Sequence, residues 1–269
     1  MKFFTLFFGF LNDIYQNKFL ITQLTKRDFS NKYIGSTLGF VWTIIQPFVM
    51  IGVMWLVFTK GFKAGPVDGI PFIAWLTCGI IVWDFFANTI SSATNVFSEY
   101  NYLVKKISFR IAILPIVKIL SALIAHFILI GIAMVIFIGS GVEFSVYWFQ
   151  MFYYMFALFI FLLGLSWITS SLQVFLKDIS QIVQVFLQFG FWLTPIMWSY
   201  KMIPENFMWA LKINPIFYIV NGYRQSFLTP TPFWQDLTSL AYFWGGTLVV
   251  VLVGVLLFRK LRPHFADVL

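Results

Sequence analysis

The chain of 269 residues is 60% hydrophobic and only 10% charged, whereas soluble domains are about half apolar and about a quarter charged. This composition excludes an ordinary water-soluble domain. The formal net charge of +8 would suit a nucleic-acid-binding protein, but membrane topology explains it better, and we expect no nucleic acid partner.

The first predicted element is an N-terminal segment over residues 1–32. Its apolar residues recur at near-helical spacing while its polar residues gather elsewhere, which indicates an amphipathic helix lying in the membrane interface. No small-residue cleavage pattern follows, so we do not expect a signal peptide. The helix is either a simple anchor or also a guide for an amphiphilic substrate.

Six stretches of mostly apolar residues follow, each long enough to cross a hydrocarbon core of about 30 Å. Five contain no Asp, Glu, Lys or Arg, and the sixth contains only Asp84. We therefore predict an all-α integral membrane fold with six transmembrane helices. They cover residues 38–58, 71–90, 119–142 with a helical start as early as 111, 144–176, 179–200 and 237–258.

Six spans place both ends of the sequence on one side of the membrane. That side would hold thirteen of the eighteen Lys and Arg residues, and the other side only five. Because cytoplasmic loops are enriched in Lys and Arg, we expect both ends to be cytoplasmic. The five cations on the outer side would be Lys60, Lys63, Lys201, Lys212 and Arg224.

The segment 98–110 between the second and third spans mixes charged residues with aromatic ones and is predicted to form a loop helix. A plain connector would need few apolar residues, whereas Tyr100, Tyr102, Leu103 and Ile107 offer apolar surface that something must cover. A partner protein is one candidate. Packing on the chain's own helices and on lipid headgroups is the other.

Residues 201–236 carry four prolines and are too short for two full spans. Apolar runs on either side of Asn214-Pro215 predict two short half-helices that enter the membrane and return. Backbone of this kind is tolerated at membrane depth only where protein or a water-filled cavity shields it. We therefore expect a pore or vestibule on the outer side, and one membrane domain over residues 33–269.

The sequence patterns of enzymes and metal sites are missing. No Gly-rich phosphate-binding loop followed by Lys-Ser or Lys-Thr occurs, so we expect neither ATP hydrolysis nor a catalytic residue nor a cofactor in this chain. His126 and His264 lie far apart without other ligands at metal spacing, which argues against a metal site. His126 is expected to be a hydrogen-bonded packing residue rather than a proton relay, and Cys78 is assigned no role.

Asp84 and Lys118 are charges within predicted spans, where each costs about 2.5 to 3.5 kcal/mol unless it finds a partner or water. The topology places both toward the cytoplasmic half of the membrane. We therefore predict an Asp84–Lys118 ion pair, with a proton-coupled role as the alternative.

Aromatic residues make up 21% of the chain, and much of that fraction suits lipid-facing and interfacial positions. Aromatic faces also suit the C–H faces of sugars. For each candidate, ordinary packing is the alternative role. The candidates to line a passage are Trp42, Phe48, Phe186, Phe189 and Trp192.

Several short motifs follow one another along the chain. They are RDFSNKYIGSTLGFVW at 27–42 with QP at 46–47, LVKKI at 103–107 with ILP at 113–115, KDI at 177–179, FWLTPI at 191–196, NP at 214–215 and YR at 223–224. Together they resemble the polysaccharide-exporting ABC-2 permeases, a family that includes O-antigen, capsule and teichoic acid exporters. Two positions depart from it: Arg110 stands where proline is common, and Lys177 where arginine is common.

The resemblance implies a homodimer of this chain with two copies of a separate ABC ATPase, which would bind ATP and Mg. Segment 98–110 would be the coupling helix, seated in a cleft of the ATPase, and the N-terminal helix would contribute to the same contact. The residues in contact with the ATPase would be Tyr100, Tyr102, Leu103, Lys105, Lys106 and Ile107.

The resemblance also implies a polysaccharide linked to polyprenyl diphosphate as the substrate and the bacterial inner membrane as the location. The pyrophosphate would be met by Lys26, Arg27 and Lys32 near the first span. The half-helices at Asn214 and Pro215 would close the pore outside, anchored by Arg224.

Within the family, O-antigen is the preferred cargo, with teichoic acid, capsule or a small molecule as alternatives. A membrane-embedded transferase would need clustered polar residues near an interface, and a proton-coupled transporter would need several buried carboxylates. The sequence shows neither pattern.

Overall fold

The structure of the protein is a computed structural model that describes residues 9, 12–105 and 110–269. Over these residues the chain is helical, and the only strand-like pairing is an isolated bridge between Val67 and Ile70. This confirms the predicted all-α class. In the same ranges, five helices are long and apolar enough to cross a membrane, and they coincide with five of the six predicted spans. They cover Gly39–Gly61, Phe72–Thr94, Ile111–Gly139, Val146–Phe175 and Leu237–His264.

The five long segments are built on one α-helix each, extended at some ends by short 3-10 or π turns. These helices are α3 (Trp42–Leu56), α4 (Phe72–Thr94), α7 (Leu114–Gly139), α8 (Met151–Phe175) and α12 (Leu237–Leu261). The shorter helices are α2 (Lys18–Asn31), α5 (Val96–Glu99), α6 (Asn101–Val104), α9 (Ile179–Leu193), α10 (Met208–Ile213), α11 (Pro215–Phe227) and α13 (Phe265–Val268).

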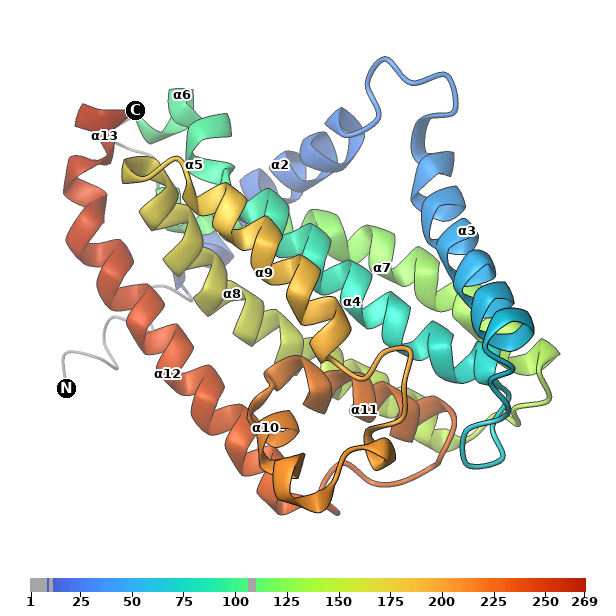
Figure 1. The fold of residues 1–269 in the computed structure, drawn as a ribbon. Coiled ribbons are helices and arrows are strands. Elements are labelled where there is room, and N and C mark those ends of the chain that lie inside the picture. The colour runs from blue at the N-terminus through green and yellow to red at the C-terminus, as the bar shows by residue number, and fades with distance from the viewer. Residues whose placement is uncertain (1–8, 10–11, 106–109) are drawn as a thin grey trace.

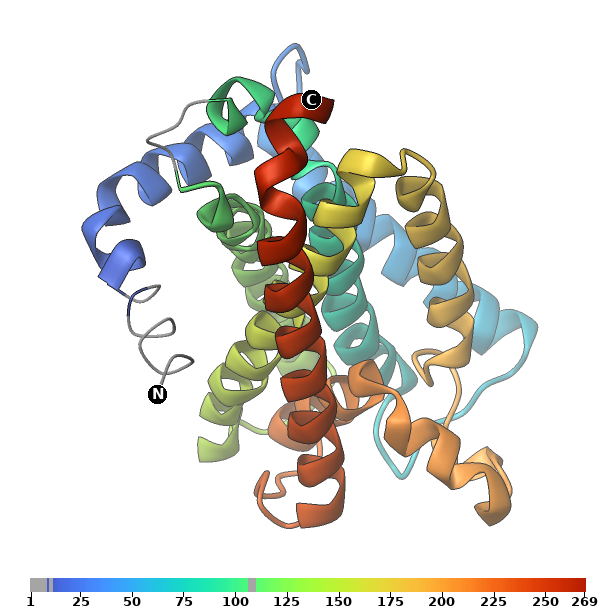
Figure 2. The same cartoon turned by 90° about the vertical axis from the view of Figure 1, so that its left-hand side faces the viewer.

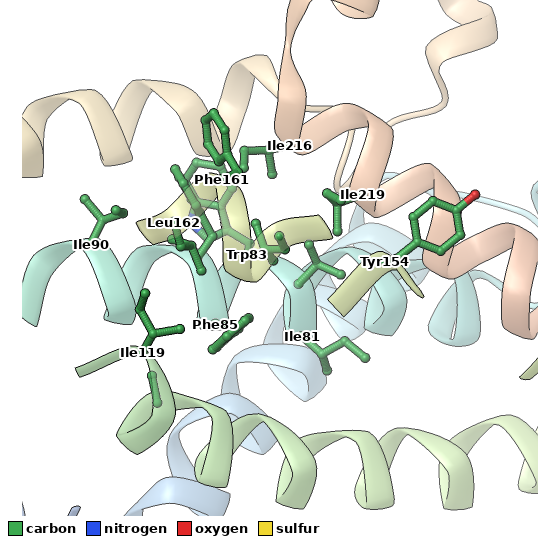
Figure 3. Packing of buried hydrophobic residues seen from close by; sticks show 14 of the residues in the cluster. Ile81, Trp83, Phe85, Ile90, Ile119, Tyr154, Phe161, Leu162, Ile216 and Ile219 are labelled. Atoms are coloured by element: carbon green, nitrogen blue, oxygen red, sulfur yellow. The ribbon is translucent and has the colours of Figure 1, made fainter. Parts of the chain in front are cut away.

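Helix α4 is the centre of the bundle. Its most apolar window is 78% buried, against 11% for the first long helix and 17% for the last. It packs against α3, α7, α8, α9 and α11, and the side chains that meet around it come from α7, α8 and α11 (Figure 3). A helix that is apolar on all sides and surrounded by others forms the core, whereas α3 and α12 keep one face for lipid or for another chain.

Helices α8 and α12 run side by side (Figure 1) and are drawn together by two glycines. A side-chain carbon on Gly254 would come within 2.5 Å of the Gly164 carbonyl oxygen, and one on Gly164 within 2.8 Å of the Val251 backbone. Small residues at such crossings let membrane helices approach closely and gain van der Waals contact.

Helix α9 is shorter than predicted. We expected a span over residues 179–200, but the helix ends at Leu193 after 15 residues, about 22 Å at the rise of an α-helix and less than the roughly 30 Å hydrocarbon core. The cause is Pro195, because the helical region is disfavoured for a residue that precedes proline. Thr194 accordingly has extended backbone angles, φ −82° and ψ 132°.

The two ends of the bundle differ. Helices α5, α6 and α13 gather at one end, and α10 with the loops around it lies at the opposite end (Figure 1). Helix α2 crosses beside the bundle rather than along it and packs against α7 (Figure 2). The interfacial role predicted for residues 1–32 stays a prediction.

Candidate functional site: a polar cleft, a broken helix and a buried ion cluster

A cleft of about 420 Å³ between α3, α4 and α9 has a polar wall. Helix α4 contributes Asn88 and Ser91, and α9 contributes Gln184 and Gln188. Gln184 Nε2 donates a hydrogen bond to Ser91 Oγ at 2.6 Å, which ties the two helices together across the cleft. Amides and hydroxyls at membrane depth, each able to donate and accept hydrogen bonds, give this cleft a surface that suits hydroxyl-rich ligands.

A second cavity, of about 430 Å³, lies between α4, α8, α9 and the start of α11. Its wall is mainly apolar, with side chains such as Phe86, Phe161 and Phe186. Trp83 and Leu187 line both cavities. Helix α9 therefore separates a cleft with a mixed polar and apolar lining from an almost wholly apolar cavity.

The five aromatic residues predicted to line a passage are all exposed in the single chain, between 40% for Trp42 and 73% for Phe186. Phe186 lines the apolar cavity and Trp192 the polar cleft. Trp42, Phe48 and Phe189 line neither, and the structure does not bring the five together. Their role as a glycan channel stays a prediction.

The polar side chains of the cleft were missed by the sequence interpretation, although the sequence carries a signal for them. Asn88 and Ser91 are three residues apart and Gln184 and Gln188 four apart, which is the spacing of one helix face. Polar residues repeated on one face of an otherwise apolar membrane helix indicate a face turned away from lipid.

The predicted break at Asn214-Pro215 is confirmed as a boundary between two helices. Helix α10 ends at Ile213 and α11 begins at Pro215. The Asn214 side chain accepts a hydrogen bond from the Ile216 backbone N–H and donates one to Thr194 Oγ1, both at 3.0 Å. Asparagine before proline is a strong helix start, since it satisfies a free N–H and proline needs none. The gating role of this segment stays a prediction.

Arg224 on α11 is buried, with 4% of its surface exposed. It donates hydrogen bonds to the carbonyl oxygens of Pro195 at 2.8 Å and Ile196 at 3.0 Å, and its guanidinium lies over the Trp75 ring at 3.2 Å from the centroid. Gly79 makes room, because an added side-chain carbon there would lie 2.9 Å from Ile196 Cγ2. Arg224 thus ties α11 to α4 and to the segment that follows α9. Its role as the anchor of an outer gate stays a prediction.

The segment 98–110 does not form one continuous helix. The described part consists of two four-residue helices, α5 and α6, that meet at Tyr100, whose backbone angles (φ −102°, ψ 28°) lie outside the helical region. Tyr100 is buried, Tyr102 is 49% exposed, Leu103 is half-buried and Lys105 is exposed. Lys106 and Ile107 lie outside the described residues. The predicted contact with an ATPase stays a prediction.

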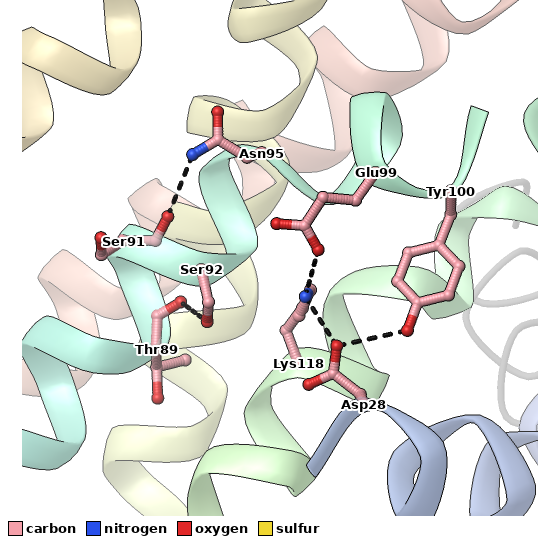
Figure 4. Close-up of polar contacts among 8 residues, drawn as sticks. All are labelled: Asp28, Thr89, Ser91, Ser92, Asn95, Glu99, Tyr100 and Lys118. Carbon is pink, nitrogen blue, oxygen red and sulfur yellow. Dashed lines mark hydrogen bonds and ion pairs between the residues drawn. The ribbon is translucent and has the colours of Figure 1, made fainter. Parts of the chain in front are cut away.

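The predicted Asp84–Lys118 ion pair is wrong. Lys118 Nζ instead lies 2.6 Å from Asp28 Oδ1 of α2 and 2.5 Å from Glu99 Oε2 of α5 (Figure 4). The reason is the rotation of α4. Phe85, the next residue along, faces α7 and stacks on His126 at 4.6 Å, whereas Asp84 hydrogen-bonds Asn88 on the side of the polar cleft.

Tyr100 completes this ion cluster. Its hydroxyl donates a hydrogen bond to Asp28 Oδ1 at 3.2 Å. Burial raises the pKa of Tyr100 well above its usual range, and the neighbouring Asp28 carboxylate raises that pKa further. Tyr100 therefore stays a neutral donor. The cluster joins α2, the segment after α4, and α7, which are far apart in sequence.

The remaining predicted residues line neither cavity. Lys26, Arg27 and Lys32 are exposed on or next to the end of α2 and line neither cavity. His126 hydrogen-bonds the Tyr223 hydroxyl at 2.8 Å and is buried, as expected of a packing residue. Cys78 is buried. No group of three metal-ligating side chains occurs within the described ranges.

Comparison with known proteins finds similarity to membrane transport proteins over most of the chain. Residues 20–228 match the family model described as ABC-2 type transporter. An O-antigen export system permease protein RfbA of Klebsiella pneumoniae is 25% identical over 93% of this chain and 95% of its own length. A protein of the same name from Myxococcus xanthus is 24% identical over 96% of this chain and 98% of its own length.

Proposed function

Since the chain belongs to the ABC-2 type transporter family, we propose that it is the permease subunit that exports an O-antigen-type polysaccharide across the bacterial inner membrane. The observation that carries this proposal is the similarity of nearly the whole chain to permeases named for O-antigen export. Five membrane-length helices in the described residues make it a multi-pass membrane protein.

The polar cleft supports a hydroxyl-rich cargo. A sugar chain presents donors and acceptors along its whole length, and it loses affinity wherever a buried polar group stays unpaired. Gln184, Gln188, Asn88 and Ser91 supply such groups on one side of α9. The apolar cavity on the other side suits a hydrocarbon chain. A polysaccharide attached to a polyprenyl diphosphate has both parts.

The distribution of cations supports an orientation with both ends in the cytoplasm. Lys26, Arg27 and Lys32 would then lie where the pyrophosphate of the substrate enters. The α10 end would face outward, and α10 and α11 would close the path there.

Energy for export would come from a separate ABC ATPase, because the chain has no phosphate-binding loop of its own. We place the contact at α5 and α6, where Tyr102 and Lys105 are exposed. Two permease chains with two ATPase subunits would form the transporter. The exposed apolar surfaces of α3 and α9, including Phe48 and Phe189, suit a contact between permease copies.

The cleft assignment is tested by replacing both amides with an apolar side chain of similar size, Gln184→Leu with Gln188→Leu. Each lost hydrogen bond costs about 0.5–1.5 kcal/mol, so we expect surface O-antigen, measured by antibody binding to intact cells, to fall by about tenfold. The control is Val185→Leu, an exposed residue of α9 outside both cavities. Undiminished export in the double variant would contradict the glycan path through this cleft.

The dependence on an ATPase is tested in lipid vesicles that contain the purified permease with or without the ABC ATPase subunit. We expect transport of lipid-linked polysaccharide only when both proteins and Mg-ATP are present. Sustained uphill transport by the permease alone would refute the proposed function. Transport of teichoic acid or capsule instead of O-antigen would change the cargo but keep the permease role.

A further inference from the structure

Two carboxylates contact Lys118, and the Lys32 cation lies close enough to both of them to interact through space. One buried ammonium group receives two carboxylates, from Asp28 on α2 and Glu99 on α5. The second oxygen of Asp28 and the Thr25 hydroxyl, one turn away on α2, are buried and have no hydrogen-bond partner among the described residues. Apolar residues of similar volume would often stabilise such a site as well or better. Stability alone therefore does not account for this arrangement.

The two carboxylates differ in their exposure to solvent. The side chain of Asp28 is 5% exposed, like that of Lys118, whereas the side chain of Glu99 is 47% exposed. Separating a fully buried pair leaves uncompensated charge in a region of low dielectric constant, which costs about 3–5 kcal/mol. A half-exposed carboxylate regains water when it leaves, so the cost is much smaller. Lys118 would keep Asp28 as its partner after Glu99 departs.

The two carboxylates also sit on different kinds of structure. Asp28 belongs to the 14-residue helix α2, which packs along α7. Glu99 ends the four-residue helix α5, which breaks away from α4 at Asn95, where the backbone leaves helical geometry (φ −93°, ψ 3°). Beyond Glu99 the backbone breaks again at Tyr100 before α6 begins. A short segment between two breaks can rotate as a unit without deforming a long helix.

We propose that Lys118 is a joint with one fixed and one releasable carboxylate. Asp28 holds α2 on α7 throughout the transport cycle, and Glu99 attaches α5 to α7 in one state and leaves it in the other. Movement of α5, the segment that we place at the ATPase contact, would then be transmitted to α7 only while Glu99 is bound. This inference rests on the proposed function and makes Glu99 a positioning residue for coupled export.

Distances between spin labels test the joint without needing the polysaccharide. Labels on Ser30 and Ser98, which are both exposed, report the distance between α2 and α5. Labels on Ser30 and Leu120 report the distance between α2 and α7. In the complex with the ABC ATPase, trapping with Mg-ATP and vanadate should shift the first distance and leave the second unchanged. Glu99→Gln should broaden the first distribution before nucleotide is added.

Export measurements distinguish positioning from simple structural support. Coupling between linked sites typically amounts to about 5- to 150-fold, so we expect Glu99→Gln to lower polysaccharide export per ATP hydrolysed by at least about fivefold. Glu99→Asp, which keeps the charge, should restore most of it. Asp28→Asn should instead lower the amount of folded protein recovered. The control is Glu143→Gln, an exposed carboxylate in the loop between α7 and α8.

The outcomes separate the two proposals. If no ABC ATPase binds the wild-type chain, the proposed function fails and the joint fails with it. If the ATPase binds but both label distances stay constant, or both shift together, the joint alone is overturned. The joint is likewise overturned if Glu99→Gln exports like the wild type, or if it lowers protein recovery as much as Asp28→Asn does.

Discussion

At the scale of single residues, Arg224 is a buried cation that forms no ion pair within the described chain. Carbonyl oxygens of Pro195 and Ile196 and the face of Trp75 surround it instead. The planar guanidinium supplies several donors in a fixed geometry and also stacks on aromatic rings, which an ammonium group does less well. Those carbonyls belong to residues just after α9, outside any helix, so they need partners from elsewhere in the protein.

We therefore expect Arg224→Met to destabilise the protein. The two carbonyl oxygens would lose their donors, at about 1–3 kcal/mol for each buried group left unsatisfied. Arg224→Lys should destabilise the protein by an intermediate amount, because one ammonium group cannot reproduce the fixed, planar set of N–H donors of the guanidinium. Thermal unfolding in detergent measures the effect, with the exposed Lys60→Met as control. An unchanged unfolding temperature for Arg224→Met would contradict the anchor.

At the scale of elements, α13 braces the segment that we place at the ATPase contact. Phe265 is fully buried, and its ring lies 5.1 Å from that of Phe97 on α5 and 6.0 Å from those of Phe175 and Phe258. A four-residue helix has too few internal hydrogen bonds to persist alone. Helices α5 and α13 therefore keep their positions relative to each other through this shared aromatic contact.

Phe265→Ala should loosen both helices. Removing a buried phenylalanine side chain costs about 3–5 kcal/mol, and here the loss falls on one end of the bundle. We expect hydrogen exchange of the α5 backbone amides to become faster and binding of the ABC ATPase to weaken, while amides in the middle of α4 stay protected. The control is Val268→Ala, whose side chain is 51% exposed on the same short helix. Equal exchange in both variants would contradict the brace.

At the scale of the whole molecule, the cations are unevenly divided between the two ends of the bundle. Lys212 lies on α10, and Lys60, Lys63 and Lys201 lie in the segments that connect α3 to α4 and α9 to α10. At the α5 end, Lys105 follows α6, and Arg259, Lys260 and Arg262 lie at the end of α12 before α13. Lys201 pairs with Asp68 at 2.7 Å, which joins two loops at the α10 end. Because cytoplasmic loops are enriched in Lys and Arg, this asymmetry predicts that the α10 end faces outward.

Single introduced cysteines can measure this orientation, because the native Cys78 is fully buried and should not react. Met202→Cys, at a site that is 76% exposed, should react with a membrane-impermeant maleimide in intact spheroplasts. Lys260→Cys, exposed next to the end of α12, should react only after permeabilisation, which also serves as the positive control. The reverse pattern would place the two ends of the sequence outside.

The sequence alone determined the membrane class, five of the membrane-length helices and the break at Asn214-Pro215. These features are local: a charge-free run must bury its backbone polar groups in a helix, and Pro215 after Asn214 suits the first turn of a new helix. Even the early end of α9 follows from Pro195, although a prediction based only on the absence of charged residues does not detect it. The polar side chains of the cleft could also have been predicted, because their spacing places them on one face of each helix.

Only the tertiary structure decided which carboxylates pair with Lys118 and that Lys26, Arg27 and Lys32 line neither cavity. It also decided which aromatic rings from different helices pack against one another. Those outcomes depend on the rotation of each helix about its axis and on how α2 crosses the bundle. A difference of one residue turns a side chain by about 100°, enough for Asp84 to meet Asn88 while Phe85 meets His126. The hydropathy pattern along the chain indicates the length of each helix but not its rotation about its own axis.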